Sequence, residues 1–152
     1  MTEADAPDIL RILMIEDNPG DVTLLRLALG AVNTEIDLDW ARTAEAALVR
    51  LETPGVEFDL ILLDLNLPTM TGIDFLKRLK TEAWLRRMPV MMLSSSHAPL
   101  DIESSYTHAA TGYIVKPSDF EGFRRLAGFL NDCWFGDGSV VLDSGDRKPI
   151  VF

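Results

Sequence analysis

Short aliphatic runs alternate with helical patterns along most of the chain. Five of the runs are short and apolar enough to be strands. The segments between them place apolar residues three or four positions apart, as an amphipathic helix does. Strands that alternate with helices predict βαβ units, and nearly unbroken aliphatic runs predict a parallel sheet covered by helices on both faces. The five expected strands are Arg11 to Glu16, Ile36 to Ala41, Phe58 to Leu63, Pro89 to Ser94 and Gly112 to Lys116.

The expected helices differ in the clarity of their patterns. The pattern around Ile102 to Ala110 is the weakest. The last helix has the clearest start, because Ser118 and Glu121 have the spacing of a capping box after Pro117. Four expected helices have clear apolar faces. In chain order, these faces are Val22, Leu25 and Leu29; Ala44, Ala47, Leu48 and Leu51; Ile73, Leu76 and Leu79; and Phe123, Leu126, Leu130 and Trp134.

Length and charge narrow the classes of function. A chain of 152 residues corresponds to about one domain. The formal net charge is −10, from 14 Lys and Arg against 24 Asp and Glu, so a direct nucleic-acid partner is not expected. The one cysteine, Cys133, excludes an internal disulfide and suits a reducing compartment. No signal peptide and no apolar run long enough to span a membrane are found, so we expect a cytoplasmic protein without membrane contact.

Polar side chains stand at the carboxyl ends of four expected strands. The first strand delivers Glu16 and Asp17, the third Asp64, the fourth Ser94 to Ser96, and the fifth Lys116. Sites in open parallel sheets form at this edge. Each residue alone has an ordinary explanation as a turn, cap or solvated side chain, but their coincidence at one edge predicts a functional site.

Three carboxylates at one place repel each other unless a cation lies among them. Carboxylate, carbonyl and water oxygens suit Mg²⁺, whereas no Cys or His has the spacing of a Zn²⁺ site. An aspartate can act as a nucleophile that forms an aspartyl phosphate. A metal ion, a lysine ammonium and a hydroxyl can stabilise the transferring phosphoryl group. The cluster therefore indicates phosphoryl chemistry.

Four motifs resemble the receiver domain of two-component response regulators. They are "IEDN" (Glu16 to Asn18 after Ile15), "LLDLNLPTMTG" (Leu62 to Gly72), "MMLSSS" (Met91 to Ser96) and "GYIVKP" (Gly112 to Pro117). The resemblance covers about Arg11 to Trp134. It implies a flavodoxin-like α/β fold, (βα)5, in which a parallel five-stranded sheet of order 2-1-3-4-5 carries helices on both faces; the chemotaxis receiver is a known example of this order.

The resemblance also implies roles for the acidic residues. Asp64 matches the phosphoacceptor, Asp17 the direct metal ligand, and Glu16 its acidic neighbour, which acts through water. Asn66 matches the position whose backbone carbonyl completes the metal site. The implied cofactor is Mg²⁺, with Mn²⁺ as a substitute. Pro68 and Gly72 would form the tight loop that turns this carbonyl toward the metal, although a turn needs such residues in any case.

Three further residues match the family's phosphate-binding and switch positions. Ser94 matches the hydroxyl residue that holds a phosphoryl oxygen, where many receivers have Thr. Lys116 matches the lysine that pairs with the acids and then with the phosphate. Tyr113 matches the aromatic switch whose rotamer follows that of the hydroxyl residue; the alternative is an aromatic side chain half-buried at a sheet edge. Neither His97 nor His108 is expected to carry phosphate, since the donor histidine of this family belongs to the kinase. We expect His97 in the loop after the fourth strand and His108 at the end of the fourth helix.

Longer stretches resemble single-domain regulators paired with phytochrome-type and hybrid sensor kinases. The expected divisions are an N-terminal tail of residues 1–10, a receiver domain of residues 11–134 and a C-terminal extension of residues 135–152. The implied partner is a sensor histidine kinase, a bacteriophytochrome being one candidate. The implied assembly is a homodimer, with Val140 to Leu142 and Ile150 to Phe152 as arms toward the second subunit; a floppy tail is the alternative. Residues after Trp134 are too few and too acidic for a DNA-binding output domain.

The predicted function is that of a phosphoacceptor signalling protein, not of an enzyme beyond self-phosphorylation and autodephosphorylation. One alternative is an unphosphorylated pseudo-receiver that acts as an interaction module, although such proteins usually lack part of the acid, hydroxyl and lysine set. A haloacid-dehalogenase-type phosphatase would need an acid where the chain has Asn66. A flavin carrier would need a hydroxyl-rich loop where Glu16 to Asn18 would repel phosphate.

Overall fold

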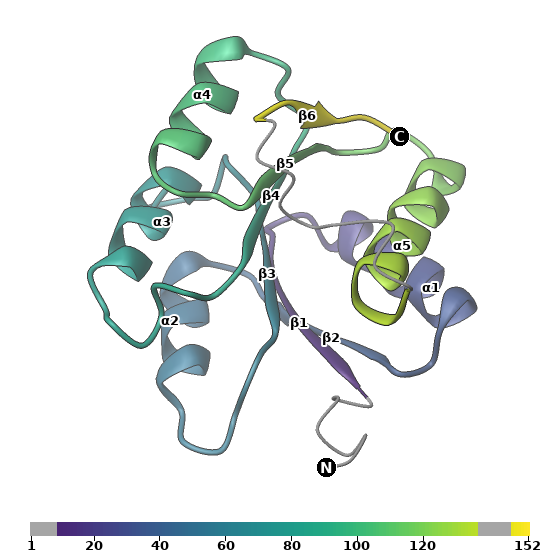
Figure 1. The fold of residues 1–152 in the computed structure, drawn as a ribbon, viewed down its shortest axis with the longest axis horizontal. Helices are drawn as coiled ribbons and strands as arrows, with labels where there is room; N and C mark the ends of the chain where they lie inside the picture. Colours follow the sequence, from purple (N-terminus) through teal and green to yellow (C-terminus); the bar gives the residue numbers. More distant parts are fainter. Residues whose placement is uncertain (1–8, 137–146) are drawn as a thin grey trace.

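The computed structural model describes residues 9–136 and 147–152. A central parallel sheet has the strand order β2-β1-β3-β4-β5-β6 (Figure 1). The elements are β1 Leu10–Ile15, α1 Pro19–Val32, β2 Ile36–Ala41, α2 Ala44–Glu52, β3 Leu60–Leu63, α3 Gly72–Lys80, β4 Val90–Ser94, α4 Pro99–Thr107, β5 Gly112–Val115, α5 Phe120–Phe135 and β6 Pro149–Ile150. Most of the expected N-terminal tail, residues 1–8, and the expected arm Val140 to Leu142 lie outside the described residues.

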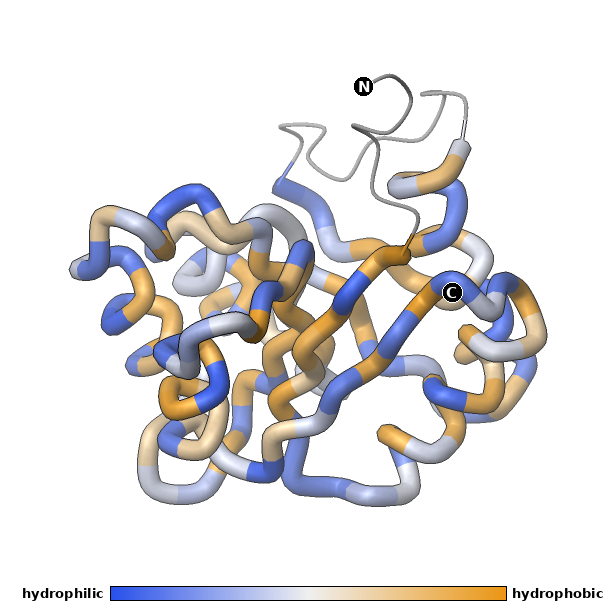
Figure 2. Tube along the Cα trace, turned by 90° about the horizontal axis from the view of Figure 1, so that it is seen from below, coloured by the Kyte–Doolittle hydropathy of each residue, from blue (hydrophilic) through white to orange (hydrophobic). Residues whose placement is uncertain are grey.

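Helices cover both faces of the sheet, as the aliphatic runs predicted. Helices α2, α3 and α4 lie on one face, and α1 and α5 lie on the other (Figure 1). Successive strand residues point to opposite faces, so that Leu13 and Ile15 pack toward α2 and α3 while Ile12 and Met14 pack toward α1 and α5. Figure 2 shows hydrophobic residues gathered mainly inside the molecule and hydrophilic residues along the outer loops. The flavodoxin-like fold is confirmed, with one strand added at the edge.

Helix α4 lies earlier in the chain than its apolar pattern suggested. The helix was expected around Ile102 to Ala110, but it begins at Pro99 and ends at Thr107. Proline is well suited to the first turn of a helix. The helix stops because Ala109 has a φ of 70°, the left-handed conformation that commonly terminates helices. Only Ser105 of this helix is fully buried, which explains the weak pattern.

The capping box predicted for α5 is wrong. The N-cap is Asp119, whose side chain accepts a hydrogen bond of 2.8 Å from the Gly122 backbone N–H. Glu121 instead forms an ion pair with Arg124 on the helix surface. The first turn packs closely on the preceding loop, since a Cβ at Gly122 would lie 2.6 Å from the Pro117 Cβ. The predicted face is confirmed: Phe123, Leu126 and Leu130 are buried and Trp134 is partly buried.

The end of the chain returns to the sheet of the same molecule. Strand β6 pairs in parallel with β5, with Pro149 opposite Tyr113 and Ile150 opposite Ile114. Beyond the strand, the Phe152 ring lies 5.6 Å from the Phe129 ring on α5. Ile150 and Phe152, which were expected to reach a second subunit, thus pack on their own chain. In the described part of the chain, no helix is both long enough and apolar enough to cross a lipid bilayer.

Candidate functional site

The central strands bring three carboxylates together at the carboxyl edge of the sheet. Glu16 and Asp64 follow β1 and β3, which are hydrogen-bonded neighbours, and the Asp64 backbone N–H donates to the Ile15 carbonyl at 3.0 Å. Glu16, Asp17 and Asp64 each offer an oxygen within 4.8 Å of the others. Glu16 and Asp64 are buried, with 1% and 6% of their surfaces exposed, whereas Asp17 is exposed. The predicted acidic cluster is therefore present and open on one side.

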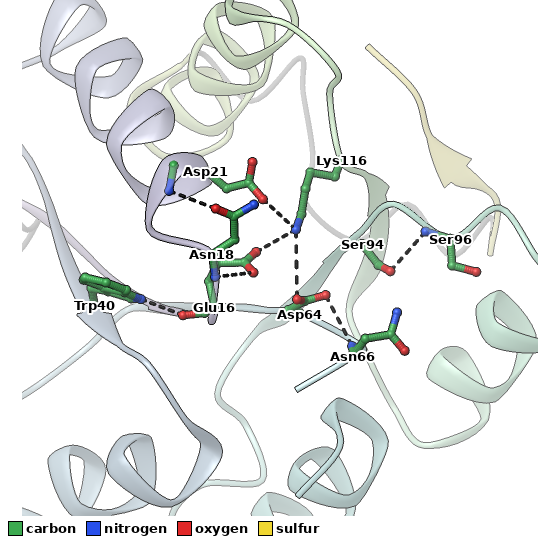
Figure 3. Close-up of polar contacts among 10 residues, drawn as sticks. Glu16, Asn18, Asp21, Trp40, Asp64, Asn66, Ser94, Ser96 and Lys116 are labelled. Atoms are coloured by element: carbon green, nitrogen blue, oxygen red, sulfur yellow. Dashed lines mark hydrogen bonds and ion pairs between the residues drawn. The ribbon is translucent and has the colours of Figure 1, made fainter. Parts of the chain in front are cut away.

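Lys116 places an ammonium group inside this cluster from the end of β5. Its Nζ lies 2.8 Å from Glu16 Oε1 and 2.8 Å from Asp21 Oδ2, but 4.0 Å from Asp64 Oδ2 (Figure 3). The Lys116 backbone N–H donates to the Ser94 carbonyl at 2.7 Å, which ties the lysine to the end of β4. The ammonium thus bridges carboxylates from two different elements.

Burial and charge change the protonation of the buried partners. Burial is the largest effect on Glu16 and, with the nearby Asp64 charge, raises the pKa of Glu16 to about 7, against the opposing effect of Lys116. Burial also disfavours the charged form of Lys116, but Asp21, Glu16 and Asp64 outweigh it and raise the pKa of Lys116 above its ordinary value. A lysine among carboxylates keeps its proton. The site therefore retains a fixed positive charge.

The loop after β1 holds Glu16 from several directions. The Asn18 backbone N–H donates to Glu16 Oε2 at 3.2 Å, and the Trp40 indole N–H donates to the Glu16 carbonyl at 2.7 Å (Figure 3). Asn18 also caps α1, because its side-chain oxygen accepts from the Gly20 N–H at 2.9 Å. With Lys116 on Oε1, both carboxylate oxygens of Glu16 are fixed.

The loop after β3 holds Asp64 by close backbone packing. The Gly72 N–H donates to the Leu65 carbonyl at 2.9 Å, and a Cβ at Gly72 would lie only 2.3 Å from the Asp64 carbonyl oxygen. The loop reaches this geometry through Thr69, whose φ is 67°. The Asn66 backbone N–H donates to Asp64 Oδ1 at 3.3 Å. The break in the aliphatic run therefore positions the carboxylate.

Ser94 and Tyr113 belong to one hydrogen-bonded group beside the site. Ser94 is fully buried, and its Oγ accepts from the Ser96 N–H at 3.2 Å. The Tyr113 hydroxyl donates to the Ser96 carbonyl at 2.9 Å, and the Ser96 hydroxyl donates to Asp101 of α4. Tyr113 is fully buried, not half-buried at an edge; burial raises its pKa although contacts with Ser94 and Ser96 oppose this. The two predicted switch residues thus meet next to α4.

Both histidines lie in the chain segments where they were expected, and neither belongs to the acidic cluster. His97 is exposed in the loop after β4, and His108 is the C-cap of α4.

Two residues of the site were not predicted. Asp21 lies in the first turn of α1, where an acidic residue needs no explanation beyond the helix dipole. Trp40 lies near the end of β2 as one more apolar strand residue. Their contacts with Lys116 and Glu16 join residues that are far apart in the chain, and no local pattern could have indicated them.

The donor set fits a hard divalent cation. Glu16, Asp17 and Asp64 supply carboxylate oxygens only, and across residues 9–136 and 147–152 no Cys or His joins this group. Carboxylates in water-accessible sites are the ligands that Mg²⁺ and Mn²⁺ prefer. Two of the three carboxylates are buried side by side, and a divalent cation would compensate their repulsion.

Comparisons with known proteins agree with this geometry. The family model "Response regulator receiver domain" matches residues 12–127. The probable methanogenesis regulatory protein FilR2 of Methanothrix harundinacea is 31% identical over 136 residues, which cover 87% of this chain and 88% of that protein. Response regulator Rcp1 of Synechocystis sp. is 30% identical over 138 residues, covering 87% and 92% of the two chains.

Solved structures of similar proteins have the same fold. The phosphorylated cyanobacterial phytochrome response regulator RcpA superposes with a TM-score of 0.78 at 29% identity, covering 87% of this chain and 98% of that chain. The Mn²⁺-bound form of Rcp1 gives a TM-score of 0.74 at 28% identity, covering 86% and 98%.

Proposed function

Because this chain belongs to the response regulator receiver domain family, we propose that it is a single-domain response regulator that accepts a phosphoryl group on Asp64. The observation that carries the proposal is the setting of this carboxylate. Asp64 lies within 4.8 Å of oxygens of Glu16 and Asp17, and 4.0 Å from the Lys116 ammonium. A nucleophile, a set of hard-cation ligands and a fixed cation are the components that phosphoryl transfer requires.

In the proposed reaction, an Asp64 oxygen attacks the phosphorus of a phosphohistidine on a sensor kinase. The bond from phosphorus to nitrogen breaks as the aspartyl phosphate forms. The loops after β1 and β3 hold the carboxylates in place before the donor arrives, which lowers the entropic cost of the reaction. Lys116 and Ser94 donate hydrogen bonds to the phosphoryl oxygens. Glu16, Asp17, Asp64 and the Asn66 carbonyl would hold Mg²⁺ or Mn²⁺, which when bound neutralises charge on the transferring group.

The signal would leave the site through the hydrogen-bonded group at β4 and β5. A phosphoryl group adds charge and acceptor oxygens at Asp64. Ser94 would turn toward it, Tyr113 would follow, and the population of α4 positions would shift, because Ser96 connects the group to Asp101.

One finer part of the proposal, the kinase partner, rests on a relative. RcpA is a phytochrome response regulator, which supports a phytochrome-type sensor histidine kinase, a bacteriophytochrome included, as partner. We assign residues 11–134 to the receiver domain and residues 135–152 to a C-terminal extension whose last residues pack on the same chain. We also propose that the protein forms a homodimer. We place the protein in the cytoplasm, where such a kinase would present its phosphohistidine.

Intact-protein mass after incubation with acetyl phosphate and Mg²⁺ tests the proposal. The wild type should gain one phosphoryl mass that is lost on denaturation at alkaline pH, and Asp64→Asn should gain none. EDTA should abolish the gain. Size-exclusion chromatography of the same samples tests the homodimer and its dependence on phosphate. Equal labelling of Asp64→Asn would contradict the assignment, and no labelling from acetyl phosphate or from a phosphorylated kinase would favour the pseudo-receiver.

A further inference from the structure

Asp21 occupies a place in the site that the proposed chemistry does not use. It lies in the first turn of α1, and 16% of its side-chain surface is exposed. Its Oδ2 lies 2.8 Å from Lys116 Nζ, as close as Glu16 Oε1. Asp21 is not part of the acidic triad of Glu16, Asp17 and Asp64. Its contact in the site is therefore with the lysine.

The position of the Lys116 ammonium reflects this contact. An ammonium has three donors, and two carboxylates at 2.8 Å draw the group toward β1 and α1, leaving Asp64 Oδ2 at 4.0 Å (Figure 3). Charge-assisted hydrogen bonds in a mostly buried setting are stronger than those between neutral groups.

We propose that Asp21 is a positioning residue that holds the Lys116 ammonium away from Asp64 and competes for it with a phosphoryl group. The inference rests on the proposed function of Asp64. The ammonium lies 2.8 Å from Asp21 but 4.0 Å from Asp64, so a move toward a phosphoryl group on Asp64 would lengthen its contact with Asp21. Asp21 thereby lowers the affinity of the site for a phosphoryl group and favours the unphosphorylated state.

A simpler role for Asp21 would not involve the lysine. An acidic residue in a first helical turn stabilises the helix dipole, typically by a few tenths of a kcal/mol to about 1 kcal/mol. Glu45, in the first turn of α2, has the same relation to its helix and is exposed. Glu45→Gln is therefore the matched control for Asp21→Asn.

Binding of beryllium fluoride, an unreactive phosphoryl mimic, tests the competition directly. The mimic is titrated into the full chain at saturating Mg²⁺, and calorimetry measures its binding. We expect Asp21→Asn to bind the mimic roughly three- to tenfold more tightly than wild type, the effect of redistributing one hydrogen bond. Asp21→Glu should restore most of the wild-type affinity, and Glu45→Gln should leave it unchanged. Unchanged or weaker binding by Asp21→Asn would overturn the inference.

A double-mutant cycle separates positioning from a purely structural role. Urea unfolding of the metal-free protein gives the coupling between Asp21→Asn and Lys116→Met without any phosphoryl mimic. If Asp21 acts through Lys116, Asp21→Asn should destabilise the wild type but not the Lys116→Met protein. Equal destabilisation of both proteins would overturn the inference. Acetyl phosphate labelling of wild type reports on the proposed function separately, because Asp64 can be phosphorylated whether or not Asp21 competes.

Discussion

The carboxyl ends of the central strands and the edge strand β6 are built very differently. At the ends of β1 and β3, the carboxylates of Glu16 and Asp64 are buried and tied by backbone packing, hydrogen bonds and the Lys116 ammonium. At the outer edge, β6 has two residues, and its neighbours hold it through exposed contacts such as the Arg147 guanidinium 5.8 Å from the Tyr106 ring centre.

The difference lies in burial and in the number of independent constraints. The Tyr106 hydroxyl donates to the Lys148 carbonyl at 3.1 Å in an exposed setting, where water competes. The corresponding interactions of Lys116 are mostly shielded from water, with 13% of its side-chain surface exposed. A site that must hold a nucleophile needs buried groups under several constraints, whereas the short edge strand β6 is held partly by exposed contacts. Variants in both regions test this contrast.

Removal of the buried cation should have the largest effect. Lys116→Met leaves Glu16 buried without its partner, and breaking a buried pair typically costs about 3–5 kcal/mol. Urea unfolding in EDTA measures the loss of unfolding free energy. Glu16→Gln in the same chain should recover part of it, since the lone charge is removed. Lys77→Met, on the exposed surface of α3, should change the unfolding free energy little. An equal loss for Lys77→Met and Lys116→Met would contradict the importance of burial.

Gly72→Ala should come next, through the backbone of the site. The added Cβ would lie 2.3 Å from the Asp64 carbonyl oxygen and 2.9 Å from the Leu65 Cα, and such overpacking typically costs about 1–3 kcal/mol. Displacement of Asp64 should also slow labelling by acetyl phosphate, measured as the rate of mass gain.

Gly30→Ala is the matched control for Gly72→Ala. Gly30 lies in α1, and a Cβ added at this position would have nothing within 4 Å apart from its two chain neighbours and the backbone of its own helix. Alanine in a helix is favoured over glycine by up to about 1 kcal/mol. Gly30→Ala should therefore stabilise the protein and leave the labelling rate unchanged. Equal behaviour of the two variants would contradict the close packing at Gly72.

Loss of the terminal ring should affect stability more than chemistry. Phe152→Ala removes a tilted ring pair with Phe129, worth roughly 0.5–1.5 kcal/mol beyond the buried area. The unfolding free energy should fall accordingly, while acetyl phosphate labelling stays within the error of wild type. Val151, which is exposed beside it, provides the control: Val151→Ala should have almost no effect. A large fall in labelling rate for Phe152→Ala would show that the outer edge supports the site.

The smallest effect concerns the start of α5, directly after Lys116. Asp119→Ala should destabilise the protein by about 1 kcal/mol, the usual cost of losing an N-cap. Ser118→Ala should cost less than about 0.5 kcal/mol, as an exposed position without such a role does. Thermal unfolding of the two variants measures the difference. A larger destabilisation by Ser118→Ala than by Asp119→Ala would favour Ser118 as the N-cap, as the capping box predicted.

Local patterns were sufficient for much of the fold and the candidate site. Continuous aliphatic runs predicted buried parallel strands, and the polar residues after them, Glu16, Asp17, Asp64 and Lys116, lie together because parallel strands end at one edge. The cap of α5 was harder to identify, since Ser118 and Asp119 are both good N-cap residues. In the structure Asp119 is the N-cap, and the helix that starts there packs Gly122 closely against Pro117.

By itself, the sequence determined the alternation of strands and helices, the residues at the strand ends and the motifs of the family, because these depend on periodicity and on neighbours along the chain. Only the tertiary structure decided that Asp21 pairs with Lys116, that Trp40 binds the Glu16 carbonyl and that Ile150 extends the sheet. Such contacts join segments that are distant in the chain, and their energies depend on burial and distance. A two-residue strand or a single first-turn acid carries no periodic signal, so its partner is fixed only when the whole chain has folded.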